Sequence, residues 1–252
     1  MTRGLLLAVA FLTRIPVRLP ADTGERDQGM AVAMYPLVGL GLGIALALPA
    51  AGAVALGLAA PPVAAILVAL LAALTGALHL DGLADTADAW LGAHGDRERM
   101  LAIMKDPTCG PAGVVVIVLT LLGKVTAVAA LLGEPAGWIG LLLAPLLART
   151  GCALLFPLLP YVRPGGLGEP GARYLAEATL LVTVTGAVLI AVIVGGLTGI
   201  VMVAVAALVL AGAGRLMRRL LGGFTGDTAG ALVEILEATT LLTAAMVLSG
   251  AH

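Results

Sequence analysis

Seven long stretches of this chain contain few charged side chains, and this feature constrains the fold more than any other. They are residues 31–58, 62–80, 111–132, 138–160, 177–196, 198–214 and 228–249. A helix of about 20 apolar residues spans the hydrocarbon core of a bilayer. Charged residues make up 12% of the chain, against about 25% in soluble domains, and the mean hydropathy is +1.10. The sequence therefore predicts an all-α, polytopic transmembrane helical bundle of about seven spans.

Two segments do not fit the simple pattern of one apolar stretch per span. The glycines at 195, 196 and 199, on either side of the boundary between the fifth and sixth stretches, leave open a kink in place of a loop. The apolar run at residues 4–12 is too short to cross a membrane, and Arg14 prevents it from continuing. No A-x-A-like cleavage site comes after it, so we expect no cleavable signal peptide. We interpret residues 1–252 as a single integral membrane domain, with 1–30 as a cytoplasmic or interfacial N-terminal segment.

The basic residues predict the orientation of the chain in the membrane. With the N-terminus in the cytoplasm, 12 of the 14 Lys and Arg residues fall in inner segments and none falls in an outer loop. The other two, Lys124 and Arg149, lie within predicted spans. Because cytoplasmic loops carry an excess of Lys and Arg, we expect an inner N-terminus, an outer C-terminus, and all the polar motifs on the cytoplasmic side.

Three aspartates come directly after the second apolar stretch: Asp81, Asp85 and Asp88. Their i, i+4, i+7 spacing places them on one face of a helix. One carboxylate costs about 2.5–3.5 kcal/mol at the centre of a membrane helix, so a cluster indicates a bound cation, and oxygen ligands favour Mg²⁺ or Mn²⁺. His79 could orient a ligand or act in acid–base chemistry, and Gly82 leaves room for a phosphate or a close backbone. The alternatives are a solvated helix end and, for His79, a structural hydrogen bond.

A second constellation, Thr-Gly-Asp-Thr at residues 225–228, is expected to start a helix. Thr225 or Asp227 would cap its exposed backbone N–H groups. A helix start built of small residues also suits a phosphate. Thr225, Gly226 and Thr228 are therefore candidate substrate-binding residues.

Glu234 and Glu237 lie on the same broad helix face as Asp227 and fall inside the last predicted span, where an unpaired charge is costly. They are candidate catalytic residues. The alternative is an ion pair that packs helices, with Arg149 as a partner. For Lys124 and Arg149, neutralising a substrate phosphate and balancing the two glutamates are equally weighted interpretations.

A third constellation is the loop over residues 104–113, which leads into the third apolar stretch. Lys105 could hold a phosphate as a point charge, and Asp106 could be a further metal ligand or the base. A plain turn with flanking charges is the alternative. Arg14 is expected to face the same cytoplasmic cavity and is a further candidate substrate-binding residue.

These residue types indicate the kind of chemistry. The sequence contains no P-loop, Rossmann glycine pattern, zinc-ligand spacing or serine-nucleophile elbow. Carboxylates with Mg²⁺ beside a membrane favour phosphoryl or pyrophosphoryl transfer on a partly apolar substrate, with no nucleic-acid partner. An ion-coupled transporter is the alternative from another class. Acidic motifs at the cytoplasmic ends of helices, and the lack of an inverted repeat, favour the enzyme.

Four of these motifs together resemble the cobalamin synthase family, the adenosylcobinamide-GDP ribazoletransferases. They are Phe-Leu-Thr-Arg-Ile-Pro-Val at 11–17, His-Leu-Asp-Gly-Leu-Ala-Asp-Thr-Ala-Asp-Ala at 79–89, Met-Lys-Asp at 104–106, and the segment 222–237 with Thr-Gly-Asp-Thr and Glu-Ile-Leu-Glu. The resemblance covers essentially the whole chain. Pro107 is a departure, because a small polar residue is expected after Met-Lys-Asp. The aspartate cluster is also similar, more distantly, to the CDP-alcohol phosphotransferases.

The resemblance implies the last assembly step of the cobalamin nucleotide loop. A hydroxyl of α-ribazole, or of α-ribazole 5′-phosphate, attacks the cobinamide-side phosphorus of adenosylcobinamide-GDP, and GMP leaves. The resemblance implies Mg²⁺, with Mn²⁺ as an alternative, a bacterial cytoplasmic (inner) membrane, and an active site that faces the cytoplasm. Small residues on many helix faces also permit a homo-oligomer.

The resemblance also implies roles for the site residues. It gives the aspartates of residues 81–88 to metal and diphosphate binding, and Lys105 to neutralising the GMP leaving group. Asp227, Glu234 and Glu237 would complete the metal set or deprotonate the ribazole hydroxyl.

Overall fold

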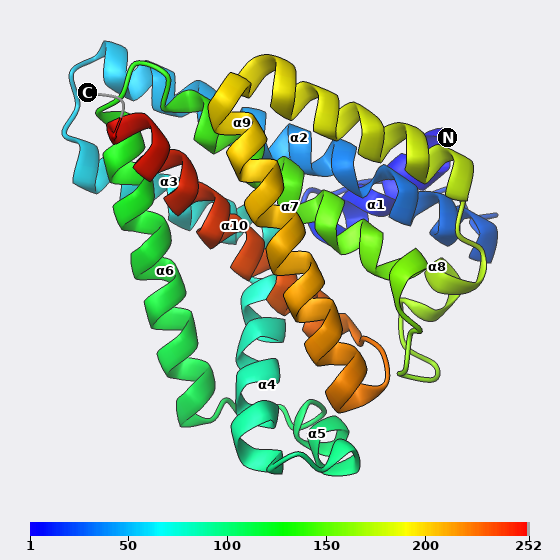
Figure 1. Cartoon of the computed structure of the whole chain (residues 1–252). Helices are drawn as coiled ribbons and strands as arrows, with labels where there is room; N and C mark the ends of the chain where they lie inside the picture. The colour runs from blue at the N-terminus through cyan, green and yellow to red at the C-terminus, as the bar shows by residue number, and fades with distance from the viewer. Residues whose placement is uncertain (251–252) are drawn as a thin grey trace.

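The computed structural model describes residues 1–250, and within them the chain forms ten helices (Figure 1). The prediction of an all-α fold is confirmed. The helices are α1 (Thr2–Leu12), α2 (Glu25–Ala55), α3 (Ala60–Thr75), α4 (Leu78–Ala93), α5 (Arg97–Ile103), α6 (Pro111–Leu132), α7 (Trp138–Leu158), α8 (Glu169–Arg173), α9 (Glu177–Leu221) and α10 (Gly226–Ser249).

Five of these helices are long and apolar enough to cross a membrane: α2, α6, α7, α9 and α10. Helices α3 and α4 pass the same test only together, and counting them as one broken span gives a sixth crossing. The chain is therefore a multi-pass membrane protein. The predicted count of about seven spans and the side of the N-terminus stay predictions.

The predicted fifth and sixth spans are two arms of α9. The helix bends sharply at Gly196, where φ is 54° and ψ is −131°, and Figure 1 shows the two arms running away from this point in different directions. A positive φ is open to glycine because glycine has no Cβ. Of the two alternatives, a kink or a loop, the structure contains the kink, and α9 is continuous in sequence from Glu177 to Leu221.

The expected helix over residues 62–80 ends earlier than predicted. After Thr75 the chain turns through Gly76 and Ala77, both with positive φ, and α4 leaves at 89° to α3. The reason is local, because Gly76 accepts the left-handed conformation that ends a helix. Helix α4 carries the three aspartates, so the elbow gives this acidic segment a direction different from that of the apolar helix α3.

Helix α7 is the centre of the molecule and the most buried of the five long helices. Helix α2 approaches it closely through small residues. A Cβ at Gly39 would lie 2.5 Å from the carbonyl oxygen of Pro145, and a Cβ at Gly43 would overlap that of Leu142. Close backbone approach at small residues is how helices associate in lipid, where apolar burial against water contributes little. This packing fixes the frame against which α4, α6 and α10 are placed.

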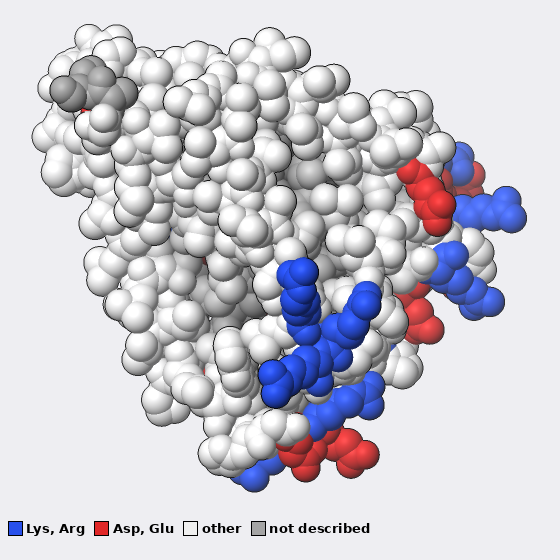
Figure 2. Space-filling model, in the orientation of Figure 1, with Lys and Arg blue, Asp and Glu red and all other residues white. Residues whose placement is uncertain are grey.

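The charged residues gather at one end of this frame. Figure 2 shows nearly all the Lys, Arg, Asp and Glu side chains of the visible face along its lower and right edges, and the rest of that face is nearly free of charge. The lower edge corresponds to α5 and the C-terminal end of α9, which carries Arg218 and Arg219 in its last turn. One charged end and an otherwise apolar surface are typical of a body embedded in a bilayer.

Candidate functional site

The site begins where α4 crosses the first turns of α10. A Cβ at Gly82 would lie 2.7 Å from the backbone oxygen of Asp227, and a Cβ at Gly230 would lie 3.3 Å from the Cα of His79. The two helices therefore touch backbone to backbone at two glycines. Of the two interpretations of Gly82, the structure shows the close backbone approach. This crossing brings Asp81 next to Asp227.

The start of α10 is held by a capping box. The hydroxyl of Thr225 accepts a hydrogen bond from the N–H of Thr228 (3.2 Å), and the hydroxyl of Thr228 accepts one from the N–H of Thr225 (2.9 Å). The predicted cap is confirmed for Thr225. Both side chains are buried and their hydroxyls are engaged in the cap, so they position the start of α10. Their predicted part in substrate binding stays a prediction. Asp227, between them, projects into the site.

A loop between α7 and α8 reaches the same place and supplies a cation. The N–H of Val162 donates to the oxygen of Phe224 (3.0 Å), and the N–H of Phe224 donates to the oxygen of Pro160 (2.9 Å). This short pairing brings Arg163 to α10, where its guanidinium donates to a carboxylate oxygen of Asp227 at 2.8 Å. Sequence reasoning missed Arg163 as a site residue. The one sequence feature that pointed to Arg163 is a charged residue within a loop rich in Gly and Pro.

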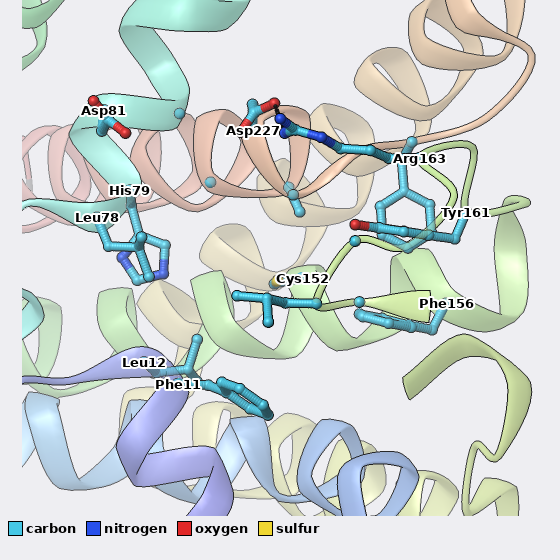
Figure 3. Close-up of a pocket in the computed structure, with 18 of the residues that line it drawn as sticks. Phe11, Leu12, Leu78, His79, Asp81, Cys152, Phe156, Tyr161, Arg163 and Asp227 are labelled. Carbon is cyan, nitrogen blue, oxygen red and sulfur yellow. Dashed lines mark hydrogen bonds and ion pairs between the residues drawn. The ribbon is translucent and has the colours of Figure 1, made fainter. Parts of the chain in front are cut away.

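Two cavities meet at these residues. One, of about 690 Å³, is the acidic cavity, lined among others by Asp81, Asp85, Lys105, Asp106, Arg163 and Asp227. The other, of about 490 Å³, is the aromatic cavity (Figure 3), lined among others by Phe11, His79, Cys152, Phe156, Tyr161 and Phe224. Asp81, Arg163 and Asp227 line both. They form a shared wall between a charged chamber and a largely apolar one.

The acidic cavity concentrates negative charge. The carboxylates of Asp81, Asp88 and Asp227 act electrostatically on that of Asp85, and the one guanidinium of Arg163 offsets this negative charge only in part. Like charges held together favour a bound cation that separates them. Within residues 1–250, however, no three His, Cys, Asp or Glu side chains already converge as ligands of one metal ion. A cation here would need ligands from the substrate or from water.

Lys105 and Asp106 line this cavity, as the sequence predicted for a shared site. The side chain and backbone N–H of Thr108 donate to Asp106, and these bonds hold the pKa of its carboxyl below its usual range. Asp106 is thus ionised at the mouth of the chamber. Gly226 lies at the other cavity. Arg14 lies apart from both, because its side chain packs over Gly76 at the elbow of α3 and α4, where a Cβ would overlap it.

Asp88, predicted as a metal ligand, is engaged in hydrogen bonds between two helices, and its role in metal binding stays a prediction. Its two carboxylate oxygens accept hydrogen bonds from the backbone N–H groups of Gly110 (2.7 Å) and Gly113 (2.9 Å). These groups lie at the start of α6, where the first N–H groups of a helix have no partner in the helix itself. A carboxylate in this position also suits the positive end of the helix dipole. Asp88 therefore ties α4 to α6.

Replacing Asp88 by Ala is expected to destabilise the protein. Loss of the acceptor for two helix-start N–H groups costs about 0.5–2 kcal/mol. The measurement is the midpoint of unfolding in detergent, compared with Asp88→Asn, which keeps one acceptor oxygen and should be milder. Unchanged stability together with weakened binding of Mg²⁺ would support metal ligation instead.

Glu234 and Glu237 lie in a separate buried cluster. Lys124 of α6 donates to Glu234 at 2.6 Å and also contacts Glu237, which pairs in addition with Arg149 of α7. All four side chains are buried, and Arg149 and Glu237 are 0% exposed. Neither glutamate lines the two cavities. Of the two interpretations of Lys124 and Arg149, the structure shows that they balance the glutamates.

His79 lies on the wall of the aromatic cavity, as Figure 3 shows. Its side chain is 3% exposed, and its Nδ1 has no hydrogen-bond partner within the part of the chain that the structure describes. The alternative of a satisfied structural histidine therefore does not hold for this nitrogen. A buried imidazole nitrogen without a partner is available to a ligand.

Comparisons with known proteins match nearly the whole chain to one family. The family model described as cobalamin-5-phosphate synthase matches residues 4–245. The adenosylcobinamide-GDP ribazoletransferase of Pseudomonas aeruginosa (strain UCBPP-PA14) is 50% identical over 247 residues, which cover 97% of this chain and 98% of the relative. A protein of the same name from Stutzerimonas stutzeri (strain A1501) is 49% identical over 241 residues, covering 94% and 96%. No solved structure matches significantly.

Proposed function

This chain belongs to the cobalamin-5-phosphate synthase family, and from this premise we propose the reaction and its site. A hydroxyl of α-ribazole, or of its 5′-phosphate, attacks the cobinamide-side phosphorus of adenosylcobinamide-GDP. The bond from that phosphorus to the bridging oxygen breaks, and GMP leaves with the electron pair. The observation that carries the proposal is the shared wall, where a cation and two carboxylates from three separate segments meet between two cavities.

The acidic cavity is the place for the diphosphate. Arg163 offers a planar guanidinium that matches phosphate oxygens, and Lys105 offers a point charge at the same cavity. Phosphoryl transfer is mostly positioning and charge neutralisation, so cations around the leaving phosphate are what the reaction requires. We assign Lys105 to neutralising the GMP leaving group, as predicted, and Arg163 to the same role.

The donor set of this cavity fits Mg²⁺. Asp81 and Asp85 stand one helical turn apart on α4, and they offer only oxygen ligands. Mg²⁺ usually keeps several waters and binds through one or two carboxylates plus substrate phosphates, which agrees with a cavity that has no preformed set of three ligands in the described part of the chain. When bound, the metal would neutralise diphosphate charge. We assign Asp81 and Asp85 to this role, with Mn²⁺ as the alternative ion.

Asp227 is the residue placed to take the proton of the attacking hydroxyl. It lines both cavities, so it lies between the place proposed for the diphosphate and the second chamber. The capping box fixes its backbone, and Arg163 fixes its carboxylate. A general base has to reach the proton that it removes. Asp227 lines the cavities and can reach it, whereas Glu234 and Glu237 are buried away from both cavities.

We propose that the site faces the cytoplasm of a bacterial inner membrane. The support is the excess of Lys and Arg at the end of the molecule that carries α5 and the C-terminal end of α9 (Figure 2). Helix α4, which lines the acidic cavity together with the loop that follows α5, lies toward that end in Figure 1. In a variant whose exposed Cys109 is replaced by Ser, a reagent that labels cysteine but does not cross membranes would react with an introduced cysteine at Glu98 only in inside-out vesicles.

The activity is tested by GMP release. Purified protein in detergent is given adenosylcobinamide-GDP, α-ribazole and Mg²⁺, and each component is omitted in turn. The proposal expects GMP only from the complete mixture, in step with the cobalamin product. GMP that forms without α-ribazole would indicate a hydrolase. Flux of either substrate into vesicles with no nucleotide product would indicate transport.

Replacing Arg163 by Gln is expected to reduce GMP release by about 10² to 10³, because it removes the cation assigned to the diphosphate and the charged partner of Asp227. Arg163→Lys should retain part of the activity. The KM for adenosylcobinamide-GDP is measured as well, since the cation is assigned to the diphosphate. Arg173→Gln is the matched control at the end of α8, where the arginine stacks on Tyr174. Equal losses in the two glutamine variants would contradict the assignment.

A further inference from the structure

We propose that the aromatic cavity binds the acceptor nucleoside, with its flat base against the apolar end and its ribose toward the shared wall. This inference rests on the proposed function and deepens it, because it assigns a second substrate to a second cavity. It also assigns the orientation of that substrate.

The cavity has a polar side and an apolar side. In Figure 3, Asp81, Arg163 and Asp227 lie along one side, and Phe11, Leu12 and Phe156 lie on the opposite side and to the right. An amphipathic ligand would be held in one direction by this gradient, since each of its ends is favoured at one side only. α-Ribazole has this character, because its dimethylbenzimidazole base is flat and largely apolar and its ribose carries hydroxyl groups.

The apolar wall is made of aromatic rings that are held in place. Phe224 packs edge to face with Phe156, at 5.0 Å between ring centroids, and with Tyr161, at 5.3 Å. The ring of Tyr161 is supported by glycines, because a Cβ at Gly166 would overlap its hydroxyl and one at Gly168 would lie 2.7 Å from the ring. Fixed aromatic faces and edges suit a planar aromatic base.

His79 gives an independent indication of a ligand. Its side chain is almost fully buried, it lines the cavity, and its Nδ1 has no partner in the described part of the chain. Buried polar groups nearly always have hydrogen-bond partners in folded proteins. A ribose hydroxyl or a base nitrogen would supply the missing partner.

The size and position of the aromatic cavity indicate which of the two substrates it holds. Cavities of about 300–1,000 Å³ hold ligands of drug size, and 490 Å³ is in the range for one nucleoside. The donor carries a corrin macrocycle as well as a nucleotide and is far larger. Because Asp81, Arg163 and Asp227 line both cavities, an acceptor hydroxyl at the shared wall would face a diphosphate in the acidic cavity.

The test uses a substitution that narrows the aromatic cavity. The KM for α-ribazole and the KM for adenosylcobinamide-GDP are measured separately. Cys152 lies at the cavity in Figure 3, and Cys152→Leu adds bulk without adding polarity. We expect about a tenfold rise in the KM for α-ribazole, a smaller rise for the benzimidazole riboside that lacks the two methyl groups, and an unchanged KM for adenosylcobinamide-GDP. Leu158→Val, at an exposed position on the same helix, is the control and should change neither constant.

A second variant covers the case in which the first does not fold. His79→Phe keeps a ring of similar shape and removes the unpartnered nitrogen, and we again expect about a tenfold rise in the KM for α-ribazole alone. Selective change of the donor KM, or an equal change for both ribosides in Cys152→Leu, would overturn the inference. Failure of the unaltered protein to release GMP would instead contradict the proposed function, so the two failures are distinguishable.

Discussion

Replacing Asp81 by Asn is expected to reduce GMP release by on the order of 10³. Asp81 belongs to the shared wall, so the change removes a negative charge from both cavities while preserving the size and shape of the side chain. It takes away one of the two carboxylates assigned to Mg²⁺ on α4. The dependence of the rate on Mg²⁺ concentration should therefore move to higher concentration, and this shift is the measurement that separates loss of the metal from misfolding.

Glu98→Gln is the control for this experiment, because Glu98 is an exposed acid on α5 away from both cavities. It should leave the rate and its Mg²⁺ dependence as they are. Asp85→Asn should resemble Asp81→Asn, since the two carboxylates share one helix face. A rate for Asp81→Asn within tenfold of the unaltered protein, at the same Mg²⁺ concentration, would remove Asp81 from the site.

Replacing Glu237 by Leu is expected to destabilise the protein by about 3–5 kcal/mol. The change leaves Arg149, which is 0% exposed, as a buried charge without its partner, while Lys124 keeps Glu234. Removing one member of a buried pair costs far more than the pair contributes, because the remaining charge has lost both water and its counter-ion. The midpoint of unfolding in detergent measures the effect.

The double variant Arg149→Met with Glu237→Leu is the matched comparison. It removes one positive and one negative charge, so the remaining Lys124 and Glu234 still form a neutral pair. Stability should recover largely, since apolar residues of similar volume can replace a buried pair. GMP release should recover with it if Glu237 only positions α10. A stable but inactive double variant would show that Glu237 takes part in catalysis, as the sequence first suggested.

The two glutamates illustrate what a local pattern leaves open. Glu234 and Glu237 share a helix face with Asp227, so spacing alone favours one common site. Along a helix, however, seven residues correspond to about 10 Å, and this distance separates Asp227, which lines the cavities, from the buried Glu234. Which carboxylates work together depends on the neighbouring segments: the loop between α7 and α8 places Arg163 beside Asp227, and helices α6 and α7 place Lys124 and Arg149 beside the glutamates.

The sequence by itself determined the class of protein, the helical fold, the aspartates on one face of α4 and the cap at Thr225. These features depend on hydropathy, side-chain spacing and hydrogen bonds between residues a few positions apart, so a short window of sequence contains them. Only the tertiary structure decided that Arg163 meets Asp227 across 64 positions, that Gly82 serves a helix crossing, and that two cavities share a wall. Those contacts depend on how whole helices pack, and a contact between distant segments leaves no mark in either segment alone.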